Sequence, residues 1–313
     1  MNDNRKLVSV VVPIYNEAAM VGQIHDRVRV IFADRQDYDW ELVFFDDGST
    51  DGTREAVEAL CAGDTHVKGV FYTRNFGYLK NTFYCMQQAK GDCAIILHAD
   101  LQNPPERIPE FLEKWEKGAR IVQGVKTKSR ENSFLYFLRS VFYLLMTKVF
   151  RVNITPHGTE FVLLDRRFLD VLKKTEVSRP FLRGIIGEYG WKTDYVYYTQ
   201  DARKMGKSKF NLNKYYDFAI CGITQYSRVI PRAVIGICMA AVLAGAVELC
   251  AVFLPGAAGQ PWLQVADSVI LRGIFLVLCL LVMLVCLLFE YVMAMMSNTT
   301  RQPLVVEEKR IRY

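Results

Sequence analysis

The chain has 313 residues, a formal net charge of +6 and 51% hydrophobic residues, and its mean hydropathy is +0.09. This length allows one large domain or two smaller ones, and the apolar content is high for a wholly soluble protein. Its eight cysteines show no C-x-x-C spacing, which argues against a disulfide framework or a cysteine metal site.

The first 125 residues alternate apolar, strand-like runs with helical stretches. Strands are expected at residues 7–15, 41–47, 67–73, 93–100 and 119–125, and helices around 18–33, 53–61, 79–89 and 105–117. Runs that are apolar at nearly every position and are separated by helices predict a parallel α/β sheet covered on both faces. Ligands of such a sheet collect beyond the carboxyl ends of its strands, so a site is expected there.

Polar and acidic motifs follow four of these strands. They read PIYNE (13–17), DDGSTDGT (46–53), RNFG (74–77) and HADLQNPPE (98–106). Asp, Asn, Gly and Pro also end ordinary strands and cap helices, but four such motifs on one rim indicate a binding site. The sequence lacks a G-x-G-x-x-G motif after the first strand and lacks a P-loop motif, which argues against dinucleotide oxidoreductases and P-loop phosphotransferases. With acids at the rim, the expected phosphate partner is a divalent cation that bridges carboxylate and pyrophosphate.

Two aromatic, amphipathic segments, 132–150 and 210–228, follow this region. Helices of this composition can lie along a membrane surface, with aromatic rings among the headgroups and basic side chains toward phosphates. Ordinary core helices are the alternative for each segment. The basic run RKMGKSK (203–209) suits nucleic acid, anionic lipid or a phosphorylated substrate. The apolar segments that come next favour lipid or a phosphorylated substrate, so no nucleic-acid partner is expected.

Two apolar segments, 233–254 and 273–296, each have about the twenty residues that a bilayer core requires. They are predicted as transmembrane helices joined by a short connection, and a pair of buried core helices is the alternative. Lys and Arg residues flank the pair on both sides, which places the long N-terminal domain on the cytoplasmic side. Glu248 and Glu290 are costly in lipid unless they face a partner helix, so a homo-oligomer is expected.

The ordered set of motifs resembles glycosyltransferase family 2, in particular the branch of dolichol-phosphate-mannose synthases and bactoprenol-phosphate glucosyltransferases. The resemblance rests on VVPIYNE, DDGSTDGT, RNFG, ADLQNPPE, LLDRR, RKMGKSKF and the two C-terminal spans, and it runs from about Val8 to RQPLVVEE. It implies a GT-A fold, which is a Rossmann-like, mostly parallel α/β sheet with flanking helices. The implied activity transfers a sugar from a nucleotide-sugar to a polyprenyl phosphate with Mn²⁺ or Mg²⁺. The implied assembly is a tetramer if the chain follows its better-known relatives.

The resemblance also assigns roles to matching positions. The expected nucleotide-sugar-binding residues are Pro13, Tyr15, Glu17, Asp46, Asp47 and Asp51, of which Asp47 and Asp51 shape the loop. The expected metal ligands are Asp100, Gln102 and His98. The expected phosphate-binding residues are Lys126, Arg130, Arg203, Ser208 and Lys209, and the expected catalytic residues are Asp100, Glu160 and Arg203.

Four positions depart from the family pattern. His98 replaces the first Asp of Asp-x-Asp-x-Gln, and a neutral imidazole ligates Mn²⁺, Fe²⁺ or Zn²⁺ well but suits Mg²⁺ poorly. Glu160 stands where Asp is expected, Lys126 where Arg is common, and Gln200 where Arg often precedes Arg203. The exchange at position 98 predicts a changed metal preference and weaker binding of any dication. Lys126 keeps the charge of an Arg but loses its bidentate grip on phosphate.

These features predict a membrane glycosyltransferase that serves cell-envelope glycan or lipid modification, in the cytoplasmic (inner) membrane with its catalytic domain in the cytoplasm. The predicted parts are a catalytic domain at 1–228, a two-helix anchor at 229–298 and a cytoplasmic tail at 299–313. Two alternatives stay open. One is a catalytically silent homologue that binds nucleotide-sugar or a partner transferase, and the other is a transferase with a non-polyprenyl acceptor. The presence of Asp100, Gln102, Arg203 and Lys209 favours an active enzyme.

Overall fold

The computed structural model describes residues 5–128, 155, 158–178, 180–199, 262–299 and 303–313, together with a few helical positions between 236 and 247. The strands are β1 (Lys6–Ile14), β2 (Tyr38–Asp46), β3 (Val67–Tyr72), β4 (Cys93–Ile96), β5 (Ile121–Lys128), β6 (Gly158–Asp165), β7 (Thr193–Thr199) and β8 (Glu307–Ile311). The helices are α1 (Ala18–Ala33), α2 (Thr53–Gly63), α3 (Tyr78–Gln88), the short η1 (Pro105–Arg107), α4 (Ile108–Glu116), α6 (Arg166–Lys174), α7 (Leu182–Tyr189) and α10 (Trp262–Thr299).

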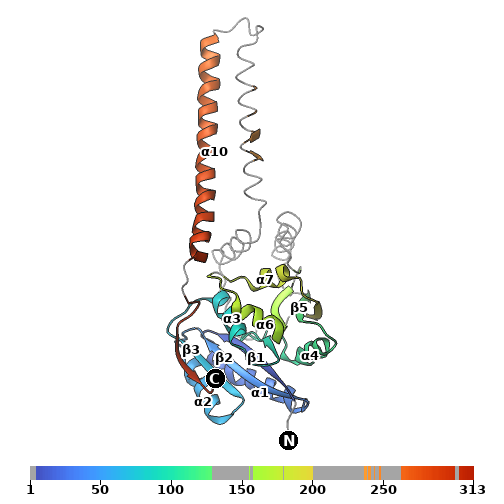
Figure 1. Ribbon diagram of the computed structural model, residues 1–313. Helices are drawn as coiled ribbons and strands as arrows, with labels where there is room; N and C mark the ends of the chain where they lie inside the picture. Colours follow the sequence, from blue (N-terminus) through green and yellow to red (C-terminus); the bar gives the residue numbers. More distant parts are fainter. Residues whose placement is uncertain are drawn as a thin grey trace.

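The described strands form one sheet in the order β7-β5-β6-β4-β1-β2-β3-β8 (Figure 1). Its centre is parallel, because β1 pairs in parallel with both β2 and β4, and β2 pairs in parallel with β3. The predicted alternation of strands and helices up to residue 125 is confirmed, and so is the mostly parallel α/β sheet. Two strands depart from the parallel pattern: β6 runs antiparallel to β4 and β5, and β8 runs antiparallel to β3.

Apolar side chains on both faces of the central strands explain why this sheet is buried. Along β1, Val10 and Val12 belong to one core and Val11 to the other, since successive side chains of a strand point to opposite faces. On β2, Phe44 and Phe45 divide in the same way. Helices α1, α2 and α4 supply the first core, while α3, α6 and α7 supply the second. The near-continuous apolar runs in the sequence are therefore strands covered on both faces.

Helix α10 leaves the α/β domain and extends away from it (Figure 1). It begins at Trp262, earlier than the predicted span at 273–296, so the second half of the expected connection is helical. Judged by length and apolar character together, no helix in the described part of the chain qualifies to cross a membrane. This finding does not support the predicted span at 273–296. The predicted span at 233–254 and the amphipathic segments at 132–150 and 210–228 lie largely or wholly outside the described residues.

Strand β8 (Glu307–Ile311), which lies within the predicted tail at 299–313, belongs to the sheet. Strand β8 pairs with β3 and covers that edge (Figure 1). Lys309 forms an ion pair with Glu58 at 2.9 Å, and the ring of Tyr313 packs edge-on against Phe45 with centroids 6.0 Å apart. The chain therefore returns from α10 to the domain that it left. Pairing along β8 also protects the β3 edge from association with other strands.

We expect Tyr313→Ala to lower the free energy of unfolding by about 2 kcal/mol, because it removes a half-buried aromatic contact that fixes β8 to the sheet. Urea denaturation of the full chain measures the change. Arg312→Ala, at the exposed neighbouring position, is the control and should stay within about 0.5 kcal/mol of the wild type. Equal effects of the two substitutions would show that Tyr313 does not hold β8 in place.

Candidate functional site

The predicted site residues gather at the carboxyl ends of the parallel strands. Ile14 at the end of β1 is in register with Asp46 at the end of β2, and Val11 of β1 is in register with Ile96 at the end of β4. The loops that follow these strands therefore leave the sheet at one edge. Pro13 is buried in β1, while Tyr15 and Glu17 lie half-buried just beyond it.

The loop after β1 is fastened to the loop after β2. Asn16 has a left-handed backbone with φ 52°, its amide N–H donates to Ser49 Oγ at 2.8 Å, and its Oδ1 accepts from the Thr50 amide at 2.8 Å. The Asp51 carboxylate accepts from the amides of Ala18 and Thr53 at 3.3 and 3.1 Å. Desolvation raises the pKa of Asp51, but hydrogen bonds led by those from Thr53 outweigh it and lower the pKa overall. These hydrogen bonds join the loops after β1 and β2 into one continuous ledge at the rim of the sheet.

Asp46 and Asp47 are both 2% exposed, and each organises backbone. Asp46 accepts from the Ser49 amide at 3.2 Å and from the Ser49 hydroxyl. Asp47 accepts from the amides of Phe76 and Gly77 at 2.7 and 3.0 Å, which ties the RNFG loop to the loop after β2. Desolvation raises the pKa of Asp47 to about 6, although these two amides act in the opposite direction. The carboxylate of Asp47 is therefore a tie between loops.

Gly48 marks a close approach of these two loops. Its φ is +69°, and a Cβ at this position would lie 2.6 Å from the carbonyl carbon of Arg74 and 2.9 Å from the amide nitrogen of Asn75. Backbone atoms cannot give way as a flexible side chain can. Only glycine therefore allows the loop after β2 to meet the RNFG loop at this distance.

The turn after β4 carries the predicted metal ligands. Leu97 continues the sheet by donating its amide to Val11 O at 2.9 Å, and Leu101 then takes a left-handed φ of 51°. The Asp100 carboxylate accepts from the Gln102 amide at 3.1 Å, which closes a tight turn bearing His98, Asp100 and Gln102. Desolvation lowers the pKa of His98 against the charges of Asp100 and Glu160, which act to raise it. At neutral pH the imidazole is accordingly neutral, the form that ligates metals.

Strand β6 brings Glu160 to the same edge, where two further side chains meet it. Glu160 is 3% exposed, Tyr78 donates its hydroxyl to Glu160 Oε2, and Arg183 Nε lies 3.5 Å from Glu160 Oε1. Desolvation and the Glu160 charge hold the pKa of Tyr78 well above its usual value, so the phenol remains a donor. Lys126 on β5 is close enough to depress the pKa of His98. The structure thus assembles Glu160 and Lys126 around the turn after β4.

A buried polar network supports this turn from behind. Tyr198 on β7 donates to Asn103 Oδ1 at 2.6 Å and lies 3.1 Å from Thr159 Oγ1. Asn103 directly follows Gln102, and Thr159 directly precedes Glu160. One hydroxyl therefore links two side chains, of which one directly follows the predicted metal turn and the other directly precedes Glu160.

Sequence reasoning missed Tyr78 and Arg183. Tyr78 directly follows the RNFG motif, which was its available signal, whereas Arg183 carries no motif and reaches Glu160 only through the placement of α7. The predicted residues Arg130, Arg203, Ser208 and Lys209 lie outside the described residues. In the described part of the chain, no group of three or more His, Cys, Asp or Glu side chains is arranged to hold a metal. A dication at this turn would accordingly need the Gln102 amide and substrate oxygens as well as His98 and Asp100.

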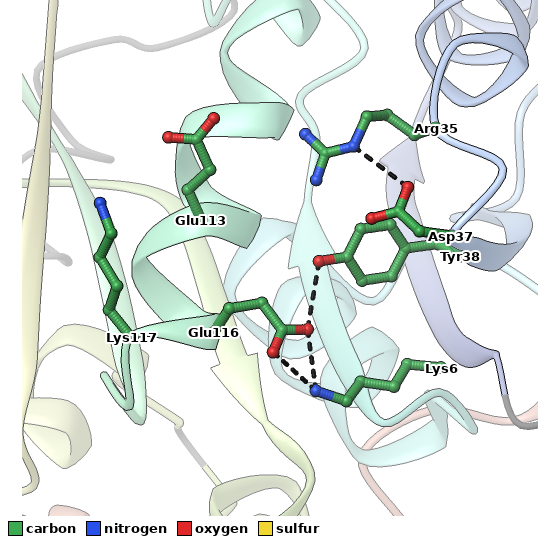
Figure 2. A pocket seen from close by; sticks show the side chains of 7 residues that line it. All are labelled: Lys6, Arg35, Asp37, Tyr38, Glu113, Glu116 and Lys117. Atoms are coloured by element: carbon green, nitrogen blue, oxygen red, sulfur yellow. Dashed lines mark hydrogen bonds and ion pairs between the residues drawn. The ribbon is translucent and has the colours of Figure 1, made fainter.

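A separate pocket lies at the opposite edge, where β1 and β2 begin (Figure 2). Two ion pairs lie in it: Lys6 Nζ is 2.7 Å from Glu116 Oε2, and Arg35 Nε is 3.3 Å from Asp37 Oδ1. Tyr38 also donates to Glu116 at 3.2 Å. The pocket shares no residue with the rim described above.

The chain belongs to glycosyl transferase family 2, whose family model matches residues 9–190. A glycosyltransferase of Bacillus subtilis (strain 168), described as uncharacterized and called YkcC, is 34% identical over 220 residues, which are 70% of this chain and 68% of that protein. A bactoprenol glucosyl transferase of Shigella phage SfV is 34% identical over 221 residues, which are 70% of this chain and 72% of the phage protein. The protein is therefore a glycosyltransferase.

A solved structure shows the same fold. Glucosyl-3-phosphoglycerate synthase from Mycobacterium tuberculosis, in complex with Mn²⁺, UDP-glucose and phosphoglyceric acid, matches with a TM-score of 0.52. The match covers 70% of this chain and 78% of that one at 16% sequence identity. Together with the family, this likeness confirms the GT-A-like α/β fold.

We expect Gly48→Ala to lower the free energy of unfolding by about 3 kcal/mol, because it adds a backbone clash to the cost of a left-handed alanine. Gly52→Ala is the matched control. Gly52 has a φ of +88°, but the nearest atom to its Cβ would be 4.0 Å away, so that variant should lose only about 1 kcal/mol. Urea denaturation measures both changes, and equal losses would show that the close approach to Arg74 does not matter.

The raised pKa of Asp47 should make the free energy of unfolding depend on pH. Its folded-state pKa of about 6 lies above the ordinary 3.8, so the folded chain binds this proton more tightly than the unfolded chain. The resulting stabilisation is complete below about pH 4 and is lost as the pH rises through about 6. The stability of the wild type relative to Asp47→Asn should therefore fall by on the order of 2 kcal/mol between about pH 4 and pH 7.

The contrast is Asp51→Asn. Since the pKa of Asp51 is lowered, its stabilisation is present above the ordinary pKa and is lost as the pH falls. Wild-type stability relative to Asp51→Asn should consequently decrease toward acid pH, the opposite slope. Parallel slopes for the two variants would contradict the assignment of a raised pKa to Asp47.

Proposed function

We propose that this glycosyltransferase moves a sugar from a nucleotide-sugar to a polyprenyl phosphate at the membrane, in the modification of a cell-envelope glycan or lipid. The observation that carries the proposal is the single rim on which the fastened loops after β1 and β2, the Asp100 turn after β4 and Glu160 of β6 come together. The polyprenyl acceptor is supported by the relatives named bactoprenol glucosyl transferase, which are 34% identical over 221 residues.

The nucleotide-sugar is proposed to bind on the ledge formed by the loops after β1 and β2. Tyr15 and Glu17 lie half-buried there, beside the buried carboxylates of Asp46 and Asp47. Hydrogen bonds among Asn16, Ser49 and Thr50 fix the loop shape before any ligand arrives. A preformed ledge lowers the entropy cost of binding a nucleoside and of orienting the sugar beyond it.

The turn after β4 fits a divalent metal in its donor chemistry. Asp100 supplies carboxylate oxygen, Gln102 amide oxygen and His98 a neutral imidazole, the mixed set that suits Mn²⁺. Such an ion, when bound, neutralises charge on the departing nucleoside diphosphate. The Mn²⁺ in the complex of the structurally similar synthase supports this part of the proposal.

The acceptor needs little activation. A phosphate monoester has a second pKa near 6, so at pH 7 it is mostly a dianion and a competent nucleophile without a strong general base. The residues then have to position the acceptor and stabilise charge. Lys126 near His98 is suited to this task, and the predicted phosphate-binding residues Arg130, Arg203, Ser208 and Lys209 extend it.

The exposed apolar side chains of α10 support the proposed attachment of the protein to the membrane. Its exposed apolar side chains include Leu271, Ile274, Leu278, Leu281, Val285, Leu288 and Phe289. A continuous apolar surface of this kind marks contact with lipid or with another protein. Together with the basic residues that flank the apolar segments, it supports the inner membrane as the location and the cytoplasm as the side of the catalytic domain.

We expect the full chain, purified in detergent with Mn²⁺ and a panel of nucleotide-sugars, to transfer one of the sugars to undecaprenyl phosphate. Asp100→Asn should reduce the transfer rate at least about 100-fold, because it removes a charged metal ligand. Asp37→Asn, in the pocket at the opposite edge, is the control and should leave the rate unchanged (Figure 2). Radiolabelled sugar in the lipid fraction is the readout.

Two outcomes would contradict the proposal in different ways. Failure of every donor with every acceptor would favour a catalytically silent homologue. Transfer to a soluble or glycan acceptor but not to undecaprenyl phosphate would overturn the polyprenyl acceptor and leave the transferase assignment intact.

A further inference from the structure

Tyr78, at the start of α3, contacts two site residues at once. Its hydroxyl donates to Glu160 Oε2 and lies 3.4 Å from His98 Nδ1. Its ring stacks on the His98 imidazole, with centroids 5.8 Å apart and planes inclined by 29°. Beyond Glu160, Arg183 Nε lies 3.5 Å from the second carboxylate oxygen. These contacts form a chain from Arg183 through Glu160 and Tyr78 to His98.

Counting donors along this chain indicates which tautomer of His98 fits the contact with Tyr78. A tyrosine hydroxyl has one hydrogen, and an ionised carboxylate can only accept. Because Tyr78 gives its hydrogen to Glu160, its oxygen faces His98 as an acceptor. A neutral imidazole that donates from Nδ1 completes this chain of contacts and leaves the lone pair of Nε2 for a metal.

We propose that Tyr78 is a positioning residue that holds His98 as the Nε2-ligating tautomer, so that this site takes Mn²⁺ in preference to Mg²⁺. Histidine ligands generally donate their other ring N–H to an oxygen acceptor, which orients the ring and raises the basicity of the ligating nitrogen. Here the acceptor is a tyrosine that is itself polarised by a buried carboxylate. A nitrogen ligand suits Mn²⁺ far better than Mg²⁺, which prefers oxygen. The inference rests on the divalent metal of the proposed function.

The same helix offers a matched control. Tyr84 of α3 also donates its hydroxyl to a carboxylate, Glu307 Oε1 at 2.7 Å, but this contact joins α3 to β8 and not to the turn after β4. Tyr78→Phe and Tyr84→Phe each remove one hydroxyl from one helix and keep the ring. A general effect of losing a hydroxyl–carboxylate bond should appear in both variants, whereas an effect through His98 should appear only in Tyr78→Phe.

The experiment titrates the full chain in detergent with Mn²⁺ alone, followed by electron paramagnetic resonance, and repeats the titration with Mg²⁺ as competitor. Tyr78→Phe should weaken Mn²⁺ binding about 10-fold and reduce the preference for Mn²⁺ over Mg²⁺, while Tyr84→Phe should match the wild type. Electron spin echo spectra of the wild type should show nitrogen coupling from a bound imidazole. His98→Ala should lose that coupling and bind Mn²⁺ more weakly, and adding Tyr78→Phe to it should have no further effect.

Three results would each overturn the inference. They are wild-type Mn²⁺ affinity in Tyr78→Phe, an equal loss from Tyr78→Phe with and without His98, and spectra of the wild type without nitrogen coupling. None of these measurements requires sugar transfer, so they are distinct from failure of the proposed function. A protein with the expected Mn²⁺ behaviour that transfers no sugar would keep the role of Tyr78 and lose the transferase mechanism proposed for this site.

Discussion

The site depends on the parallel pairing of β1 with both β2 and β4. Because the register aligns Ile14 with Asp46 and Val11 with Ile96, three loops from distant parts of the chain leave the sheet at one edge. The pairing brings the loops together but does not fix their shapes. Short hydrogen bonds do that, above all those from the amides of Phe76 and Gly77 to the buried carboxylate of Asp47. Burial of apolar side chains therefore holds the sheet together, and a different set of contacts, polar hydrogen bonds, holds the loops at its rim. Asp47 is a buried residue that makes such bonds.

The antiparallel insertion of β6 adds a buried carboxylate to this rim. Strand β6 places Glu160 there with 3% exposure, and Arg183 and Tyr78 supply the partners that a buried carboxylate needs. The network of Tyr198, Asn103 and Thr159 then links a side chain just after the Asp100 turn to one just before Glu160.

The parts of this arrangement that could be predicted from the sequence are those that depend on short, local sequence patterns. Apolar runs of strand length and the polar motifs after them predicted β1 to β5 and the rim, because strand direction alone fixes which edge a motif reaches. The pairing of β6 between β4 and β5 and of β8 with β3 could not be read, since both depend on contacts between residues far apart in the chain. Glu160 was recognised through the family pattern, while Arg183 had neither motif nor local signal. Tyr78 followed a recognised motif, but its direction depends on how α3 packs.

The histidine at position 98 is best understood from the charges around it. Asp100 and Glu160 both act on His98 strongly enough to oppose the effect of desolvation on its pKa. An aspartate at position 98 would place a third carboxylate beside these two, and like charges at close range in a partly buried site repel one another unless a cation is bound. A neutral imidazole avoids this repulsion and still offers a ligand. It also requires an acceptor for its second nitrogen, and Tyr78 provides one. The histidine at position 98 and the tyrosine that follows the RNFG motif are therefore in direct contact, and under the proposed metal role they would act as a pair.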